Sequence, residues 1–157
     1  MRPYAVIIGT RTLSNGEAAA AKLNSGVPTS SSEISVVQID VSSAASIEAA
    51  VALITSTHGR IDSLINNAGA AFDLEIQDGK CSIRDGFNTS WDTNVSGTHI
   101  LTTHVVPLLL ESSDPPLLFL TLGTSSIRET LPRTGATCRP SRASTHRRPP
   151  GGPSRRR

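Results

Sequence analysis

The sequence has few aromatic residues. They make up 3% of its 157 residues, with one tyrosine and one tryptophan, whereas hydrophobic residues together make up 37%. A core must therefore be built from Val, Ile, Leu and Ala. Such residues suit a parallel sheet with strands buried on both faces better than an aromatic-rich β-sandwich. The length is enough for one domain with its own core but short for two.

Cysteines and long apolar runs are also scarce. Cys81 and Cys138 form no CxxC pair, so neither a metal site nor a disulfide scaffold is predicted. No run approaches the roughly 20 apolar residues that span a bilayer. The first apolar run, residues 5–8, is too short for a signal-peptide core of about 7–15 residues. We therefore expect a cytoplasmic location and no membrane partner.

Acidic residues are absent from the C-terminal part of the chain. Residues 1–132 hold all 13 acidic residues, and from Arg133 onward there are arginines but no acids. Residues 133–157 are also rich in proline and poor in apolar residues, which predicts a disordered Arg/Pro-rich tail after a domain of residues 1–132. Arginines bind nucleic-acid phosphates, but the tail has no aromatic residue for base stacking. We do not expect nucleic acid as a partner.

Apolar and β-branched stretches alternate with helical patterns along residues 4–123. The patterns predict strands within residues 4–10, 34–40, 60–69 and 116–123, and helices over 14–23, 42–59 and 90–112. Residues 72–89 form a polar stretch, in which turns are predicted at Asp78-Gly79 and Asp85-Gly86. This alternation predicts βαβ units and a parallel, doubly wound sheet.

Each predicted strand ends in a polar residue. These strand ends are Thr10-Arg11, Asp40, Asn66-Asn67 and Thr121. Ligands of doubly wound sheets bind beyond the carboxyl ends of the strands, so the four ends indicate a binding site. Taken alone, Asp40 is equally consistent with a helix N-cap or a solvated turn.

Three segments resemble the short-chain dehydrogenase/reductase family: "VVQIDVS" (36–42), "IDSLINNAG" (61–69) and "WDTNVSGTHILTTHVVPLLL" (91–110). The resemblance covers about residues 4–130. It implies a Rossmann-like fold and hydride transfer between a nicotinamide cofactor and a small carbonyl or alcohol substrate. Many members of the family are homo-oligomers, so the resemblance makes a second copy or an intact homologue a candidate partner.

The resemblance assigns cofactor contacts to two of these segments. Asp40 matches the aspartate that contacts the adenine ring, with Val41 beside it. The next motif supports the sheet and lines the cofactor ribose, and it corresponds to Asn66, Asn67, Ala68 and Gly69. A residue without Cβ, such as Gly69, lets a ligand approach the backbone.

Two further residues receive roles from the resemblance. Asn94 matches the catalytic asparagine, which holds a helix irregularity and a water; the alternative is an ordinary polar residue on a helix face. Arg11 ends its strand where family members choose between cofactors. Because a guanidinium matches a phosphate, Arg11 favours NADP over NAD. A solvated surface arginine is the competing interpretation.

The glycine-rich turn that opens a Rossmann domain is missing. Gly9 and Gly16 form no cluster, and one predicted strand, rather than two, separates the first strand from the NNAG strand. The opening strand therefore resembles the second strand of the family, and the first βα unit is absent. In the order 3-2-1-4-5 the missing strand is central. The sheet is expected to close over a gap or to pair in another order.

The family's catalytic residues are also missing. Leu122 stands at the position of the catalytic serine. The family's proton donor is a tyrosine four residues before a lysine, but the only tyrosine is Tyr4 and the only lysines are Lys22 and Lys80. No such pair can form.

The sequence thus predicts an oxidoreductase of this type that is inactive in its present form. The alternative is a non-catalytic nucleotide-binding or regulatory module that pairs with an intact homologue. The change of composition after about residue 132 further suggests an out-of-frame or mis-spliced extension, which resequencing of the transcript would test.

Overall fold

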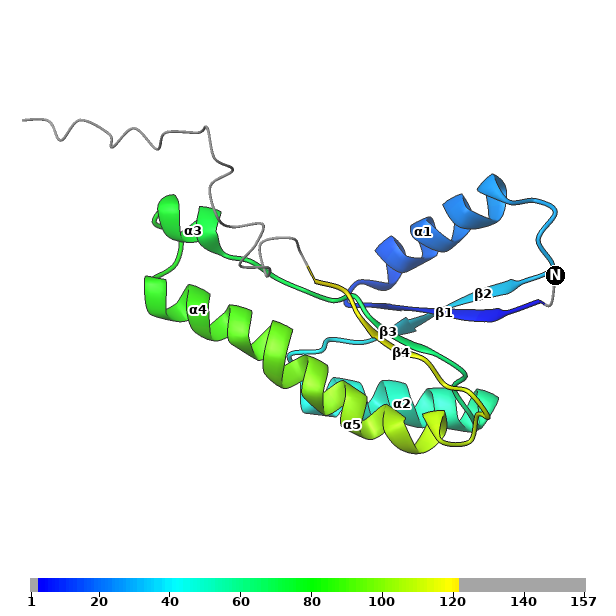
Figure 1. Cartoon of the computed structure of the whole chain (residues 1–157). Helices are drawn as coiled ribbons and strands as arrows, with labels where there is room; N and C mark the ends of the chain where they lie inside the picture. Colours follow the sequence, from blue (N-terminus) through cyan, green and yellow to red (C-terminus); the bar gives the residue numbers. More distant parts are fainter. Residues whose placement is uncertain (1–2, 122–157) are drawn as a thin grey trace, which may run out of the picture. The chain divides into compact units, whose positions relative to one another are not determined.

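The computed structural model describes residues 3–121, and these residues alternate between strands and helices (Figure 1). Their order is β1 (Ala5–Thr10), α1 (Leu13–Gly26), β2 (Glu33–Gln38), α2 (Ala44–His58), β3 (Leu64–Asn66), α3 (Asp73–Gln77), α4 (Ile83–Trp91), the π-helix η1 (Asp92–Gly97), α5 (Thr98–Leu109) and β4 (Leu117–Phe119). The predicted α/β class with parallel strands is confirmed. The predicted tail, residues 133–157, lies outside the described residues.

The strands form two separate parallel pairs instead of one sheet. β1 pairs with β2 from Ala5↔Glu33 to Thr10↔Gln38. β3 pairs with β4 over three residues, centred on Ile65↔Leu118. The sheet was expected either to close over the gap or to pair its strands in another order. Neither occurs, because β1 and β3 are not paired with each other. The helices connect the pairs instead: α2 contacts β2 and α5, and α5 contacts β3.

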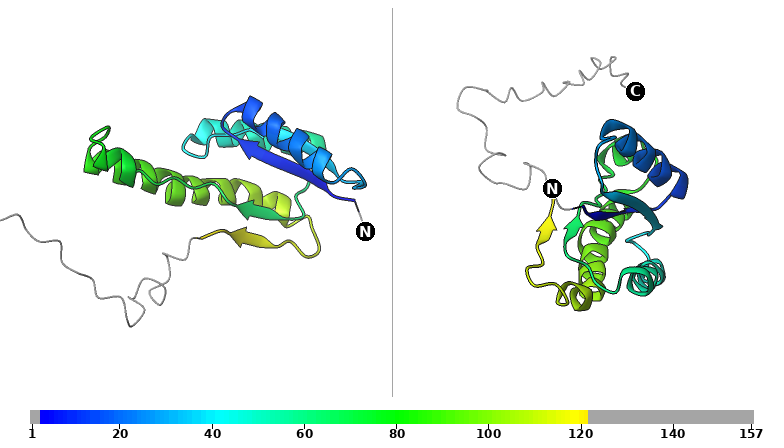
Figure 2. Two further views of the ribbon diagram at one scale, coloured as in Figure 1. Left: turned by 90° about the horizontal axis from the view of Figure 1, so that it is seen from above. Right: turned by 90° about the vertical axis from the view of Figure 1, so that its right-hand side faces the viewer.

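Helices lie on both sides of the β1–β2 pair (Figures 1 and 2). α1 covers one face, and α2 lies with α5 on the other side. The approach of α1 is close, because a Cβ at Gly16 would lie 2.5 Å from Val36 Cγ1 and 2.6 Å from Thr10 Cγ2. A glycine is therefore needed at this contact between α1 and the strands.

The core is aliphatic, as the composition predicts. Its members are Ala20, Val37, Val41, Ile47, Ala50, Val105, Leu108 and Leu109. They come from α1, from β2 and the turn after it, and above all from α2 and α5. This core holds the turn after β2 against α2 and α5, where the predicted site residues begin.

The last long helix begins earlier than predicted. α4 starts at Ile83, because the Ser82 hydroxyl accepts a bond from the Asp85 amide at 3.0 Å and donates to Asp85 Oδ2 at 2.6 Å. The first of these bonds satisfies the free Asp85 amide at the helix start, and the second holds the Ser82 hydroxyl in place. The turn predicted at Asp85-Gly86 is therefore wrong. Pro107 lies inside α5 without ending it.

Two serines fix the start of α2 and the turn before it. The N-cap is Ser43, whose hydroxyl accepts a bond from the Ser46 amide at 3.3 Å. The Ser46 hydroxyl accepts a bond from the Asp40 amide at 2.9 Å, and so fixes the turn that follows β2. Gly59 ends the helix with φ of 73°, as predicted.

Within residues 3–121, no helix has the length and apolar character needed to cross a membrane. The same residues contain no cluster of three or more His, Cys, Asp or Glu side chains that could hold a metal ion.

Candidate functional site

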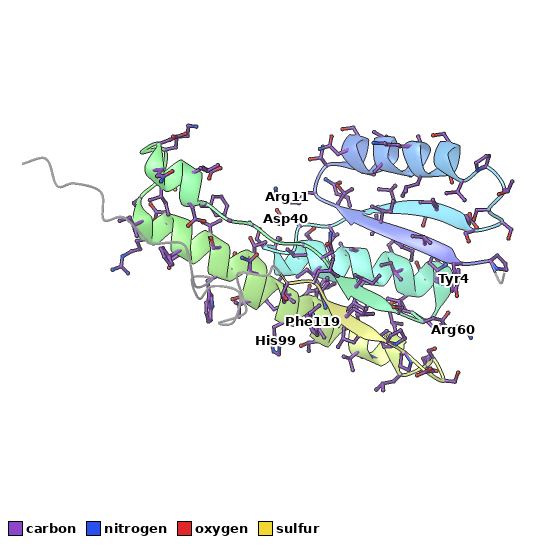
Figure 3. All side chains as sticks on the ribbon, turned by 45° about the horizontal axis from the view of Figure 1, so that its top comes forward. Tyr4, Arg11, Asp40, Arg60, His99 and Phe119 are labelled. Atoms are coloured by element: carbon purple, nitrogen blue, oxygen red, sulfur yellow. The ribbon has the colours of Figure 1, made fainter. Side chains whose placement is uncertain are left out.

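Arg11 and Asp40 lie next to each other at the carboxyl ends of β1 and β2 (Figure 3). Arg11 is exposed, and Gln38 Nε2 donates to its carbonyl oxygen at 3.1 Å. The parallel pairing of β1 with β2 brings these two strand ends to one edge, as expected for parallel strands. A cation and an anion are thus presented together beyond the strands.

Asp40 is held as a carboxylate. The Ser42 hydroxyl donates to Asp40 Oδ1 at 2.7 Å, and the Ser42 amide donates to the same oxygen at 3.0 Å. These two bonds, together with the positive charge of Arg11, lower the pKa of Asp40 against the opposing effect of burial. No described residue bonds to Oδ2, so this oxygen remains available to accept a bond from a ligand.

The stability lost on Ser42→Ala should depend on pH, because Ser42 lowers the pKa of Asp40. A lowered folded-state pKa stabilises the protein above the unfolded value of about 3.9, and this contribution disappears as pH falls through the folded-state pKa. We expect the variant to lose about 1 kcal/mol at pH 7, with the difference shrinking below about pH 4. Urea unfolding at several pH values measures it. Ser56→Ala, which removes an exposed bond to the Leu53 carbonyl, should show no such trend.

Asn94 lies in the π-helix η1, where the helix is irregular. Its Oδ1 accepts a bond from the Ala70 amide, and its Nδ2 donates to the Ala70 carbonyl oxygen, both at 2.8 Å. These two bonds fasten the loop after β3 to the helix. Gly69 lies against the same side chain, since a Cβ there would lie 3.5 Å from Asn94 Oδ1.

Gly97, at the end of η1, connects this loop to the Asp40 turn. A Cβ at Gly97 would overlap the carbonyl oxygen of Val41. Val41 is buried, so the helix and the turn meet without intervening side chains. The sequence analysis did not single out Gly97. The signal that could have found it is a glycine within a predicted helix, three residues after Asn94.

The two asparagines of the NNAG motif take different positions. Asn66 is 7% exposed, and its Nδ2 donates to Thr102 Oγ1 at 3.1 Å, which ties β3 to α5. Asn67, Ala68 and Gly69 are exposed in the loop after the strand. Asn66 therefore supports the fold from inside, and the next three residues face outward. No pattern in the sequence indicated that Thr102 would accept this hydrogen bond from Asn66.

A hollow of about 240 Å³ lies beside Asn94. Its lining comes from the loop after β3 and from α3, α4 and η1, and includes Ala70, Phe72, Ile76, Phe87 and Asn94. Asp73, Ser90 and Asn94 supply the polar groups of this lining, and the other lining residues are apolar or glycine.

The catalytic positions are not filled by the described residues. Tyr4 is 71% exposed and lies near the start of β1, away from Arg11 and Asp40 (Figure 3). Residue 122, predicted at the position of the catalytic serine, lies outside the described residues. The sites of Arg11, Asp40 and Asn94 thus have no tyrosine beside them in this part of the chain.

Parallel strands joined by crossover helices are the architecture of a Rossmann-like fold. The family model of the short chain dehydrogenases matches residues 2–120. The chain belongs to this family of oxidoreductases, whose members bind nicotinamide cofactors.

The chain is similar to proteins from several organisms. It is 38% identical over 130 residues to the short-chain dehydrogenase/reductase eupG of a Phoma species, covering 81% of this chain and 47% of the relative. Menthone neomenthol reductase from Mentha piperita superposes with a TM-score of 0.67 at 21% identity, over 78% of this chain and 53% of that one.

L-sorbose reductase from Gluconobacter frateurii, solved with NADPH and L-sorbose, gives a TM-score of 0.60 at 20% identity, over 73% and 41% of the two chains. The chain spans about half the length of the curated relatives it matches.

Proposed function

We propose that this chain binds NADP through the strand-end residues and does not by itself transfer a hydride to or from a carbonyl or alcohol. The observation that carries the proposal is the pair of Arg11 and Asp40 at the ends of β1 and β2. Two charges of opposite sign suit a ligand with a phosphate at one end and hydrogen-bond donors on a ring at the other.

The residues present fit the adenosine half of the cofactor. Asp40 Oδ2 is free to accept a bond from the adenine amino group, and Val41 beside it anchors this turn in the core. Arg11 is exposed and offers a planar fork to the additional phosphate of NADP. When bound, the cofactor would supply the hydride; the chain's own contribution is binding.

Asn67, Ala68, Gly69 and Asn94 fit the other half of the cofactor. The first three are exposed beyond β3, and the Asn94 amide holds the following loop in place through Ala70. A glycine at residue 69 leaves the backbone open to a ribose. The chain offers no glycine-rich turn for the pyrophosphate, so we expect weaker binding than in complete members of the family.

Inactivity is inferred from the residues that proton transfer needs. The one tyrosine has no lysine four residues after it, and it lies away from the strand ends. Cofactor binding without turnover would make this chain a nucleotide-binding module, with an intact homologue as its partner. Carbonyl-dependent oxidation of NADPH by the purified chain, measured with a panel of aldehydes and ketones, would overturn this part of the proposal.

Arg11→Ala tests the cofactor preference. Loss of a charge-assisted pair of bonds to phosphate is worth about 1.5–3 kcal/mol, so Kd for NADPH should rise about 10- to 100-fold, whereas Kd for NADH should change little. Calorimetric titration measures both. Arg60→Ala is the matched control: Arg60 pairs with Asp62 at 3.3 Å, before β3. An equal loss for NADPH and NADH would contradict the phosphate contact.

A further inference from the structure

Three exposed residues, Asn67, Ala68 and Gly69, follow β3 without hydrogen bonds of their own. Within the described part of the chain, no hydrogen bond involves the backbone or the side chain of any of the three. Ordering a backbone residue costs conformational entropy. This segment therefore keeps one conformation only if its two ends hold it.

The first end of the segment is held from inside the fold. Asn66, the last residue of β3, is buried, and its carbonyl oxygen accepts a bond from the Leu120 amide at 3.0 Å. Its Nδ2 donates to Thr102 Oγ1 at 3.1 Å. The Thr102 hydroxyl donates its one proton to the Thr98 carbonyl oxygen at 2.8 Å, which leaves its lone pairs to accept the bond from Asn66.

The second end of the segment is held by the same continuous helix. Asn94 bonds to both the amide and the carbonyl oxygen of Ala70, each at 2.8 Å. η1 runs directly into α5, and Thr102 lies about two turns after Asn94, a rise of about 12 Å. The chain from Asn66 to Ala70 reaches at most about 14 Å when extended. One helix is therefore long enough to hold both ends.

We propose that Thr102 is a positioning residue for cofactor binding. Thr102 and Asn94 form a clamp that fixes residues 67–69 before the cofactor arrives, so that binding does not have to order them. Thr102 acts through Asn66 and is not among the residues assigned to the cofactor. The inference rests on the proposed function, in which residues 67–69 contact the cofactor ribose.

Thr102→Val removes the hydroxyl and keeps the shape of the side chain. We expect Kd for NADPH to rise about 5- to 30-fold, the equivalent of ordering about one backbone residue. Kd for NADH should rise by the same factor, because both cofactors carry the ribose. Loss of the Arg11 guanidinium, by contrast, should affect NADPH alone. Calorimetric titration of the full chain measures both constants.

Two variants control for a merely structural effect. Thr102→Ser restores the hydroxyl and should bring Kd back to within about twofold of the unmodified chain. Thr103→Val makes the same change one residue later, at an exposed threonine that bonds to the His99 carbonyl oxygen, and should leave Kd unchanged. Circular dichroism checks that each variant is folded at the temperature of the titration.

NMR order parameters test the clamp in the absence of cofactor. The backbone amides of residues 67–69 should give values of about 0.85 in the unmodified chain and below about 0.6 in Thr102→Val. Asn94→Ala, at an exposed residue, should have the same effect, and it tests the clamp from its other end should the valine variant not fold. Because loss of either end releases the same segment, the double variant should bind NADPH at most about twofold more weakly than the weaker single variant.

The outcomes separate this inference from the proposed function. Binding of NADPH by the unmodified chain, with an unchanged Kd in Thr102→Val, would overturn the positioning role and leave the proposed function intact. Affinity losses that multiply in the double variant, or order parameters that stay at about 0.85 in both single variants, would also overturn it. Absence of NADPH binding by the unmodified chain would overturn the proposed function and this inference with it.

Discussion

Asn66→Asp is expected to lower the free energy of unfolding by about 3 kcal/mol at pH 7. The native amide donates to Thr102 Oγ1, and that hydroxyl donates onward to the Thr98 carbonyl at 2.8 Å. A carboxylate has no proton to donate, so it would face an acceptor at a position that is 7% exposed. A buried charge without a partner is among the most costly substitutions.

The neighbouring asparagine supplies the control for this substitution. Asn67 is exposed, and Asn67→Asp should change stability by less than about 0.5 kcal/mol. Burial raises the pKa of the carboxyl introduced at residue 66. Its cost should therefore fall as pH drops and the group becomes neutral. Urea unfolding at pH 7 and pH 5 measures both effects; equal losses at the two positions would contradict the difference in burial.

Gly97→Ala is expected to cost about 1–3 kcal/mol and to weaken cofactor binding. The added methyl group would overlap the Val41 carbonyl oxygen and lie 3.1 Å from the Asp92 carbonyl oxygen. Because both neighbours are backbone atoms, the π-helix and the Asp40 turn must separate. The relative positions of Asp40 and Asn94 change with them.

Thermal unfolding with and without NADPH measures both consequences of Gly97→Ala. Gly26→Ala is the matched control, since a Cβ at the last residue of α1 meets no atom within 4 Å. That change should be neutral or stabilising by up to about 1 kcal/mol, because alanine favours the helix more than glycine does. A Gly97→Ala protein as stable as the unmodified chain, with the same response to NADPH, would show that the contact is not needed.

The alternation of strands and helices and the aliphatic core follow from local sequence. β1 and β2 are rich in β-branched residues, and α2 ends at Gly59 where the sequence predicts it. α4 was missed because Asp85-Gly86 has the composition of a turn, while the Ser82 cap forms only in the helix. Local patterns therefore predict most elements. Where a turn pattern and a helix cap overlap, as at residues 82–86, the hydrogen bonds of the folded chain determine which structure forms.

The sequence by itself determined the class of fold, the family motifs, and the lack of a tyrosine followed by a lysine. Only the tertiary structure separated Asn66 from Asn67, since Asn66 is the last residue of β3 and bonds to Thr102 of α5, whereas Asn67 begins the exposed loop after the strand. Tertiary structure also joined Asn94 to Ala70, 24 residues away, and kept the strands as two pairs. Long-range contacts of this kind depend on packing among elements, and no local pattern encodes them.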